Sequence, residues 1–145
     1  SDRNNPHRLI RAIERHEEGR AHLITENDSP YETLYLVLDP PREQNDLKID
    51  KRVDEMFKKG LVKENTELRE QGYSTDLSAL KTIGYQEFDE HFSGDQTLEE
   101  THELIALHTK QYAKRQRTWF RKNEDAQWIH TTGEGIQMIE EFINR

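Results

Sequence analysis

Between Thr109 and Lys122 the sequence carries six Lys or Arg residues and no Asp or Glu. The whole chain of 145 residues has a net charge of −8, so this basic segment stands apart from an acidic remainder. Clustered cations on an acidic protein favour one anionic partner held in one place over unselective nucleic-acid binding. Lys and Arg at this density suit phosphate contacts, which are the sequence-independent part of nucleic-acid recognition.

A helix is predicted to carry this segment, because Thr97 to Glu100 has the capping-box pattern and no Gly or Pro follows before Lys122. Arg115 falls among the apolar residues, where a guanidinium reaches water or meets a carboxylate or phosphate. Gln116 beside it suits a base edge or a backbone hydrogen bond. One face is predicted to hold Leu104, Ile105, His108, Tyr112 and Trp119, and the other Lys110, Lys114, Arg117 and Arg121. Tyr112, Trp119 and Phe120 could stack on bases, but their helical spacing favours the core.

A second basic stripe is predicted near the start of the chain. Asn5 and Pro6 have the N-cap and first-turn pattern of a helix that ends at Gly19. Leu9, Ile10 and Ile13 would form its apolar side, with Arg8, Arg11 and Arg15 opposite them. Two such stripes favour phosphate binding over two merely hydrated surfaces.

The remaining elements are mostly helical. Residues 31–38 read as a buried strand whose only partner in this sequence is a brief candidate around Trp128 and Ile129, so the other strands of its sheet would lie elsewhere. Asp39 is predicted to cap a helix that ends at Gly60, followed by a helix over 62–71. Another helix is predicted from about Ser78 with Gly84 inside it, and a last one around residues 136–143.

Several chemistries are excluded by what the sequence lacks. It has no Cys, and its seven His show no metal-ligand spacing, so we expect no metal site. No serine-nucleophile motif or phosphate-binding loop is present, and no apolar run is long enough to span a membrane. A cytoplasmic setting is expected. The residues alone favour a helical RNA-binding unit, with a helical interaction domain as the alternative.

Four segments in order resemble the signatures of the tRNA dimethylallyltransferase family, also called tRNA isopentenyltransferase. They are "NNPHRLIRAIE", "KRVDEMFKKGL", "LKTIGYQEF" and "YAKRQRTWFR". The resemblance covers only the C-terminal half of a family member. It implies a mainly α-helical fold with one or two strands, forming the C-terminal part of a P-loop NTPase-like α/β fold whose nucleotide-binding half is absent. Residues 1–30 would end a helical insertion domain, and residues 31–145 would belong to the catalytic core.

The resemblance also implies an activity, transfer of a dimethylallyl group from dimethylallyl diphosphate to N6 of adenosine 37 of tRNA. Arg52 would bind the diphosphate. The tRNA contacts would come from His7, Arg8, Arg11, Lys81, Thr82, Gly84, Tyr85, Gln86, Lys114, Arg115, Gln116, Arg117 and Arg121. The partner would be the anticodon stem-loop, bound by a monomer, and the intact enzyme would use Mg²⁺.

The chain departs from the family pattern at several points. The phosphate-binding loop and the aspartate expected to act as the base have no counterpart, so this chain alone is expected to be inactive and no catalytic residue is assigned. Arg117 stands where an aliphatic residue is expected, and Lys81 where Arg or Gln is usual. The alternative is a stand-alone helical RNA-binding module without catalysis.

Overall fold

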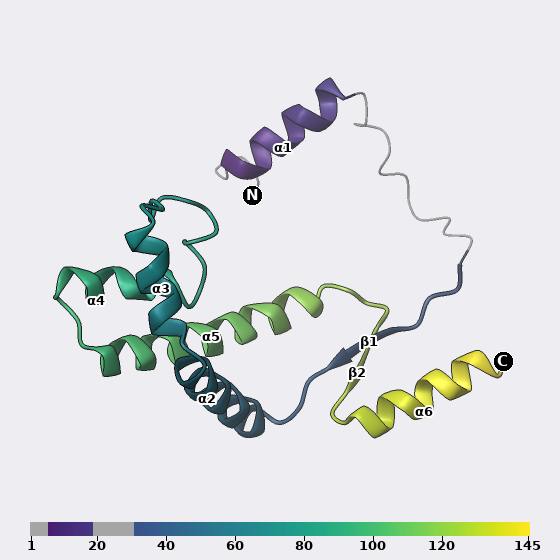
Figure 1. Cartoon of the computed structure of the whole chain (residues 1–145). Coiled ribbons are helices and arrows are strands. Elements are labelled where there is room, and N and C mark those ends of the chain that lie inside the picture. Colours follow the sequence, from purple (N-terminus) through teal and green to yellow (C-terminus); the bar gives the residue numbers. More distant parts are fainter. Residues whose placement is uncertain (1–5, 19–30) are drawn as a thin grey trace. The chain divides into compact units, whose positions relative to one another are not determined.

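The computed structural model describes residues 6–18 and 31–145 and divides the chain into two units, Ser1–Thr33 and Leu34–Arg145 (Figure 1). The first unit contains helix α1 (Pro6–Glu17), which confirms the predicted first helix. Leu9, Ile10 and Ile13 of α1 are exposed. Asn5 and Gly19, which the sequence places at the two ends of this helix, lie outside the described residues.

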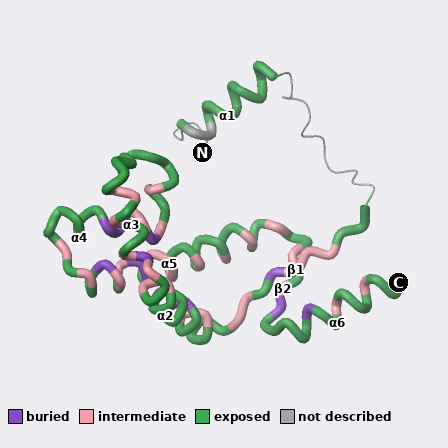
Figure 2. Tube along the Cα trace, in the orientation of Figure 1, coloured by how far each residue is buried: buried purple, intermediate pink, exposed green. Residues whose placement is uncertain are grey.

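Three helices form the core of the second unit: α2 (Arg42–Lys58), α3 (Leu61–Glu70) and α5 (Leu98–Phe120). Gly60 has a φ of 102°, and this left-handed conformation allows the chain to end α2 and begin α3 at once. The largest fully buried side chains are those of Phe88, Ile105, Val53 and Thr101. Figure 2 shows that most buried residues lie where these three helices meet.

The capping box of α5 is confirmed. Thr97 accepts a hydrogen bond from the Glu100 backbone N–H, and Glu100 accepts one in return from the Thr97 backbone N–H at 2.8 Å. This reciprocal pair satisfies two N–H groups that a helix start otherwise leaves without partners. It fixes where α5 begins and therefore which residues face α2.

The prediction of a helix from about Ser78 is wrong. Residues 73–85 contain turns and bends but no helix, and they are followed by a 3-10 turn η2 (Gln86–Phe88) and the short helix α4 (Asp89–Ser93). Gly84 has a φ of +99°, which an α-helix does not allow, and its carbonyl accepts a hydrogen bond from Asn65 of α3 at 3.2 Å. Gly84 is therefore the point where a loop, rather than a helix, approaches α3.

Two strands pair in parallel, β1 (Tyr35–Leu38) and β2 (Ala126–Ile129), with Tyr35 opposite Ala126 and Leu38 opposite Ile129. The brief strand expected around Trp128 and Ile129 is thus present, while β1 is shorter than the predicted 31–38. Together with the helices, this pair confirms a mainly helical fold with one or two strands.

The last helix, α6 (Thr132–Ile143), packs against the strands. A Cβ on Gly135 would lie 2.8 Å from Ile129 Cδ1, so the helix approaches β2 closely. Ile136, Ile139 and Ile143 of α6 remain exposed. Among the residues that the structure describes, no helix is long and apolar enough to cross a membrane.

Asp39 does not cap α2, contrary to the sequence expectation. Helix α2 begins after Pro41, which serves as N-cap without a side-chain hydrogen bond. Asp39 follows β1 directly and accepts a hydrogen bond from Arg117 Nε of α5 at 2.5 Å. A carboxylate paired with a guanidinium gains more than one bonded to a neutral backbone N–H, which explains the difference.

Candidate functional site

An open cavity of about 540 Å³ lies between α2, α5 and the loop that precedes η2. We call it the α2–α5 cavity. Its apolar lining comes from Val53, Met56, Ile83 and Ile105. Its polar lining consists of Arg52, Lys81, Thr82, Gln86, Thr109, Tyr112 and Arg115. Five of the site residues expected from sequence therefore meet here, although they are spread from position 52 to position 115: Arg52, Lys81, Thr82, Gln86 and Arg115.

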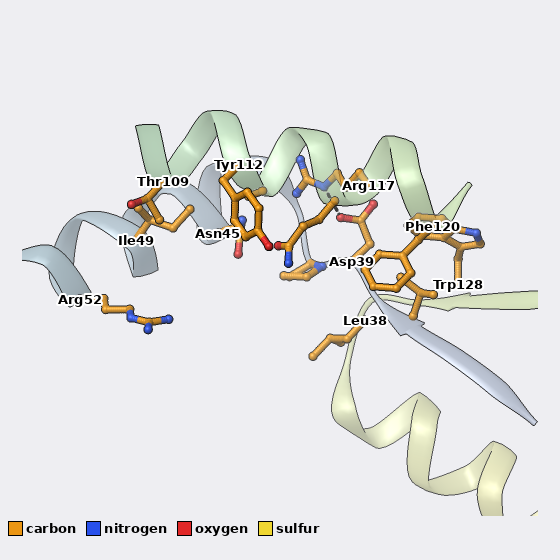
Figure 3. Close-up of a pocket in the computed structure, with 14 residues that line it drawn as sticks. Leu38, Asp39, Asn45, Ile49, Arg52, Thr109, Tyr112, Arg117, Phe120 and Trp128 are labelled. Carbon is orange, nitrogen blue, oxygen red and sulfur yellow. Dashed lines mark hydrogen bonds and ion pairs between the residues drawn. The ribbon is translucent and has the colours of Figure 1, made fainter. Parts of the chain in front are cut away.

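A second pocket of about 350 Å³ lies at the carboxyl end of β1 (Figure 3). We call it the strand-end pocket. Asp39 and Arg117 lie in it with their side chains joined, and the predicted residue Gln116 also lines it. Arg52, Thr109 and Tyr112 line both the strand-end pocket and the α2–α5 cavity, so these three residues mark the border between them.

Arg52 is the charged residue at this border, and its charge is not neutralised by a described partner. Its side chain is exposed, and it forms no hydrogen bond or ion pair with any residue that the structure describes. In contrast, Arg69 is paired with Asp89, and Arg117 with Asp39. A guanidinium left free beside two cavities can bind an anionic ligand in a bidentate way.

The basic stripe predicted on α5 is only partly correct. Lys110 Nζ lies 2.6 Å from Asp50 Oδ1, and Arg117 is bonded to Asp39, so both charges are used inside the protein. Lys114 forms no ion pair within the described part of the chain, and the Arg121 guanidinium lies 5.8 Å from the centre of the Trp128 ring. The four cations of this face therefore differ: Lys110 and Arg117 are paired with carboxylates, whereas Lys114 and Arg121 form no described ion pair.

A different set of cations forms an open groove on α5. Lys114, Arg115 and Lys122 line it with Gln111, Thr118 and Trp119, over about 490 Å³. We call it the basic groove. Trp119 is 64% exposed and Tyr112 is 49% exposed, so the prediction that these aromatic residues belong to the core is wrong for this chain. Phe120 is partly buried and lies against Tyr35, as a core residue would.

Arg115 belongs to both the basic groove and the α2–α5 cavity. It is exposed, and its guanidinium lies 5.7 Å from the centre of the Tyr112 ring. Of the two outcomes expected for a guanidinium on the apolar face, contact with water is the one observed, and Arg115 still lines the α2–α5 cavity together with Val53 and Met56. The contact with Tyr112 keeps the charge of Arg115 beside a ring face rather than beside a carboxylate.

The loop from Lys81 to Gln86 makes mostly internal contacts. Lys81 Nζ lies 3.2 Å from Asp76 Oδ1, and Thr82 donates to the Ala79 carbonyl. Tyr85 donates its hydroxyl to Glu64 Oε1 at 2.8 Å, and this hydrogen bond, with burial, raises the pKa of Tyr85 above its ordinary value. Gly84 and Tyr85 line neither cavity.

The other predicted tRNA contacts lie on α1. Positions 7 and 8 fall within this helix, but the side chains of His7 and Arg8 lie outside the described residues. Arg11 is exposed and lies 4.0 Å from Glu14 on the same helix. Because α1 belongs to the first unit, its part in binding stays a prediction.

Sequence reasoning missed several residues that shape the site. Thr109 lines both cavities, and the buried Glu87 accepts a hydrogen bond from the backbone N–H of Gly84 in the loop that borders the α2–α5 cavity. Asp39 carried a readable signal, because a carboxylate directly after a parallel strand lies at the edge where α/β proteins bind ligands. No comparable signal in the sequence indicated Glu87, because its bond to His108 joins residues that are far apart in the chain.

The described residues do not form a metal site: no group of three or more His, Asp or Glu could hold an ion. The two cavities contain one carboxylate, Asp39, which is already paired with Arg117. Mg²⁺ prefers oxygen ligands, so the lining of these cavities does not fit it.

Comparison with known proteins shows which family the chain resembles. The family model described as IPP transferase matches residues 1–123. The chain is 41% identical over 137 residues to the tRNA dimethylallyltransferase of Lachnoclostridium phytofermentans, covering 87% of this chain and 42% of that protein. It is 44% identical over 105 residues to the tRNA dimethylallyltransferase of Trichormus variabilis, covering 72% of this chain and 35% of that protein.

A solved structure from the same family has a similar fold. The full-length tRNA isopentenylpyrophosphate transferase of Bacillus halodurans superposes with a TM-score of 0.71 at 32% identity, covering 97% of this chain and 45% of that one. The chain thus spans less than half the length of these relatives. The resemblance carried by its four motifs is confirmed, and the chain belongs to the IPP transferase family.

Proposed function

We propose that this chain is the C-terminal part of a tRNA dimethylallyltransferase, which moves a dimethylallyl group from dimethylallyl diphosphate to N6 of adenosine 37. The observation that carries the proposal is Arg52, an exposed guanidinium without a described partner on the border of two adjoining cavities. Family membership supports the reaction class, since the curated relatives are named for it.

The reaction needs positive charge where the leaving group forms. A bond forms between N6 of adenosine and C1 of the dimethylallyl group, while the bond from C1 to the diphosphate oxygen breaks and the amine loses a proton. The diphosphate therefore gains negative charge in the transition state, and a guanidinium already directed at it lowers the barrier. Arg52 would hold the diphosphate in this way, and no residue of this chain is proposed as the base.

The lining of the α2–α5 cavity suits the rest of the donor. Val53, Met56, Ile83 and Ile105 provide an apolar surface next to Arg52. A dimethylallyl group is a small branched hydrocarbon, so contact with such a surface removes its apolar area from water. Charge and apolar surface thus lie side by side, as the two ends of dimethylallyl diphosphate require.

The basic groove would hold the tRNA. Lys114, Arg115 and Lys122 have no described carboxylate partner, and the exposed Trp119 lines the same groove. Cations suit the phosphates of the anticodon stem-loop, and an exposed ring suits stacking with an unpaired base. Arg115 lines both the groove and the cavity, so it would connect the tRNA site to the donor site.

The wider enzyme is also part of this proposal. The parallel pairing of β1 and β2 fits the C-terminal part of a P-loop NTPase-like sheet, with the nucleotide-binding loop, Mg²⁺ and the base supplied by the other half. We propose the domain division at residues 1–30 and 31–145, a monomeric cytoplasmic enzyme, and no transfer activity for this chain alone.

A chimera tests the proposal. This chain replaces the matching C-terminal residues of the Lachnoclostridium phytofermentans relative, and transfer of labelled dimethylallyl groups to an unmodified anticodon stem-loop is measured. We expect activity from the chimera and none from the chain alone. Arg52→Gln should lower the transfer rate at least tenfold, because one donor to the leaving group is commonly worth about 10²-fold or more.

The matched control is Lys51→Gln, which removes one exposed positive charge from the next position of α2 without touching either cavity. It should leave the rate within about twofold. Equal losses in the two variants would show that Arg52 acts only through net charge. A folded chimera that binds the stem-loop but never transfers the group would favour an RNA-binding module without catalysis.

A further inference from the structure

Glu87 is a buried carboxylate that lies behind the wall of the α2–α5 cavity. The residue is 4% exposed, and its side chain is fully buried. It does not line the cavity, yet the residue before it, Gln86, does. A buried carboxylate is costly unless its oxygens accept hydrogen bonds, so its partners show what it stabilises.

Glu87 accepts three hydrogen bonds from two different parts of the chain. Its Oε2 accepts from the backbone N–H of Gly84 at 2.8 Å. Its Oε1 lies 2.7 Å from His108 Nδ1 on α5 and 3.1 Å from Gln86 Nε2. The carboxylate therefore ties the loop wall of the cavity to α5.

Gly84 is fixed from both sides. Its N–H is bonded to Glu87, and its carbonyl accepts from the buried amide of Asn65, which also donates to the Leu61 carbonyl at 2.9 Å. The positive φ of Gly84 is what brings the N–H toward the carboxylate while the chain continues into η2. The loop wall is thus held to both α3 and α5.

The bond from Gln86 to Glu87 sets the polarity of the cavity wall. Because Nε2 of Gln86 donates one of its two N–H groups to the carboxylate, the Oε1 atom and the second N–H are left without a partner among the described residues. A carboxylate oxygen cannot donate a hydrogen bond to that amide, so the reverse orientation would leave two acceptors facing each other. The bond to Glu87 therefore fixes which end of the amide carries the acceptor, and at the position of Oε1 Gln86 offers an acceptor to a ligand.

We infer that Glu87 is a positioning residue that fixes the Gln86 amide so that the α2–α5 cavity presents a hydrogen-bond acceptor suited to the amino group of an adenine base. The assignment of the ligand rests on the proposed function. The fixed orientation of the amide rests only on the contacts around Glu87. The two parts can therefore be tested separately.

Glu87→Gln gives the sharpest perturbation, because it keeps the shape and changes one oxygen to an NH₂ group. The backbone N–H of Gly84 can only donate, so the oxygen of the introduced amide stays with it. The new NH₂ group then faces Gln86 and His108. Both can adapt: Gln86 by a half-turn of its amide, and His108 by moving its proton from Nδ1 to Nε2. The position held by the acceptor Oε1 in the wild type is then held by the donor NH₂ group.

The first readout needs no ligand. Nitrogen-15 NMR of the full chain reports the His108 tautomer, and we expect Nδ1 to be protonated in the wild type and unprotonated in the neutral ring of Glu87→Gln. The control Glu64→Gln removes a carboxylate that also bonds this loop, through Tyr85, but keeps an oxygen acceptor, so His108 should not change. An unprotonated Nδ1 in the wild type would overturn the inference.

The second readout is binding of two anticodon stem-loops, one with adenosine at position 37 and one with purine, which lacks the amino group. The wild type should favour adenosine by about fivefold to tenfold, the range of one hydrogen bond. Glu87→Gln should lose this preference, and Gln86→Glu added to Glu87→Gln should restore it. Gln86→Ala, at an exposed residue, should lose it even if the buried variants do not fold.

The outcomes separate the two proposals. Equal binding of both stem-loops by the folded wild type would overturn the assignment of Gln86 to the amino group. If neither stem-loop binds, the tRNA function fails, and the NMR result still decides whether Glu87 Oε1 is the acceptor that the orientation of the Gln86 amide requires. A preference that survives in Gln86→Ala would also overturn the assignment.

Discussion

Removing the three cations of the basic groove should weaken RNA binding in a salt-dependent way. Removal of one phosphate-binding cation lowers the slope of log K against log salt by about 0.7 to 0.9. The variant Lys114→Gln/Arg115→Gln/Lys122→Gln should therefore lower the slope by about 2 to 3. Between 50 and 200 mM salt, three such cations correspond to about a 20- to 40-fold change in affinity.

The salt dependence expected from the structure is smaller than the one expected from the sequence. Counting all six Lys and Arg between Thr109 and Lys122 as phosphate contacts would give a change of about 300- to 2,000-fold over the same range. Because Lys110 and Arg117 are paired with Asp50 and Asp39, they should contribute little. The double variant Lys110→Gln/Arg117→Gln should keep the wild-type slope.

The assay is fluorescence anisotropy of a labelled anticodon stem-loop titrated with the full chain at several salt concentrations. Circular dichroism checks that each variant is folded, since the double variant leaves two carboxylates unpaired. Differences between variants remove any contribution from α1, which all of them retain. A double variant that changes the slope as much per charge as the groove variant does would show that Lys110 and Arg117 also contact phosphates, despite their pairing with Asp50 and Asp39.

Three further predictions concern stability, measured as the free energy of unfolding in urea. Asp39→Ala should destabilise the chain by about 1 to 3 kcal/mol, because it leaves the half-buried Arg117 guanidinium without its partner, and adding Arg117→Met should recover part of the loss. No recovery would mean that Asp39 acts through another contact. Gly133→Ala should be neutral or stabilising, whereas Gly135→Ala should be less stable than Gly133→Ala by about 1 kcal/mol or more, because its Cβ would meet Ile129 Cδ1 at 2.8 Å. Equal stability of the two would contradict the close approach of α6 to β2. The pKa of Glu100 lies below its ordinary 4.5 because it accepts from the Thr97 N–H and hydroxyl, so its contribution is present above pH 4.5 and lost as the pH falls through the lowered pKa. Glu100→Gln should flatten this acid limb of the stability curve, and an unchanged limb would contradict it.

The helices that begin or end with strong local signals could be predicted from sequence. The capping box at Thr97 and Glu100 fixed the start of α5, and Gly60 marked the junction of α2 and α3. Each signal depends on residues within one helical turn, so the sequence contains all of the information needed. Gly84 shows the limit, because its left-handed conformation depends on Asn65 and Glu87 rather than on its neighbours alone.

The free and paired cations of α5 could not be told apart from sequence. Lys110 and Arg117 look the same as Lys114 in a helical projection, and their partners Asp50 and Asp39 lie on other elements. Periodicity gives the angle of a residue on its own helix but not the charge that faces it. Arg52 shows the opposite case, because the resemblance singled it out and the structure places it between two cavities.

The parallel pairing of β1 with β2 has a consequence for the order of folding. Almost the whole helical core lies between these two strands in the chain, so their pairing must close a very long loop. That closure is entropically unfavourable until α2, α3 and α5 have already brought its ends near each other. The amides of β1 and β2 should therefore exchange with deuterium sooner than those in the middle of α5, and the strands should separate while the helices still hold together.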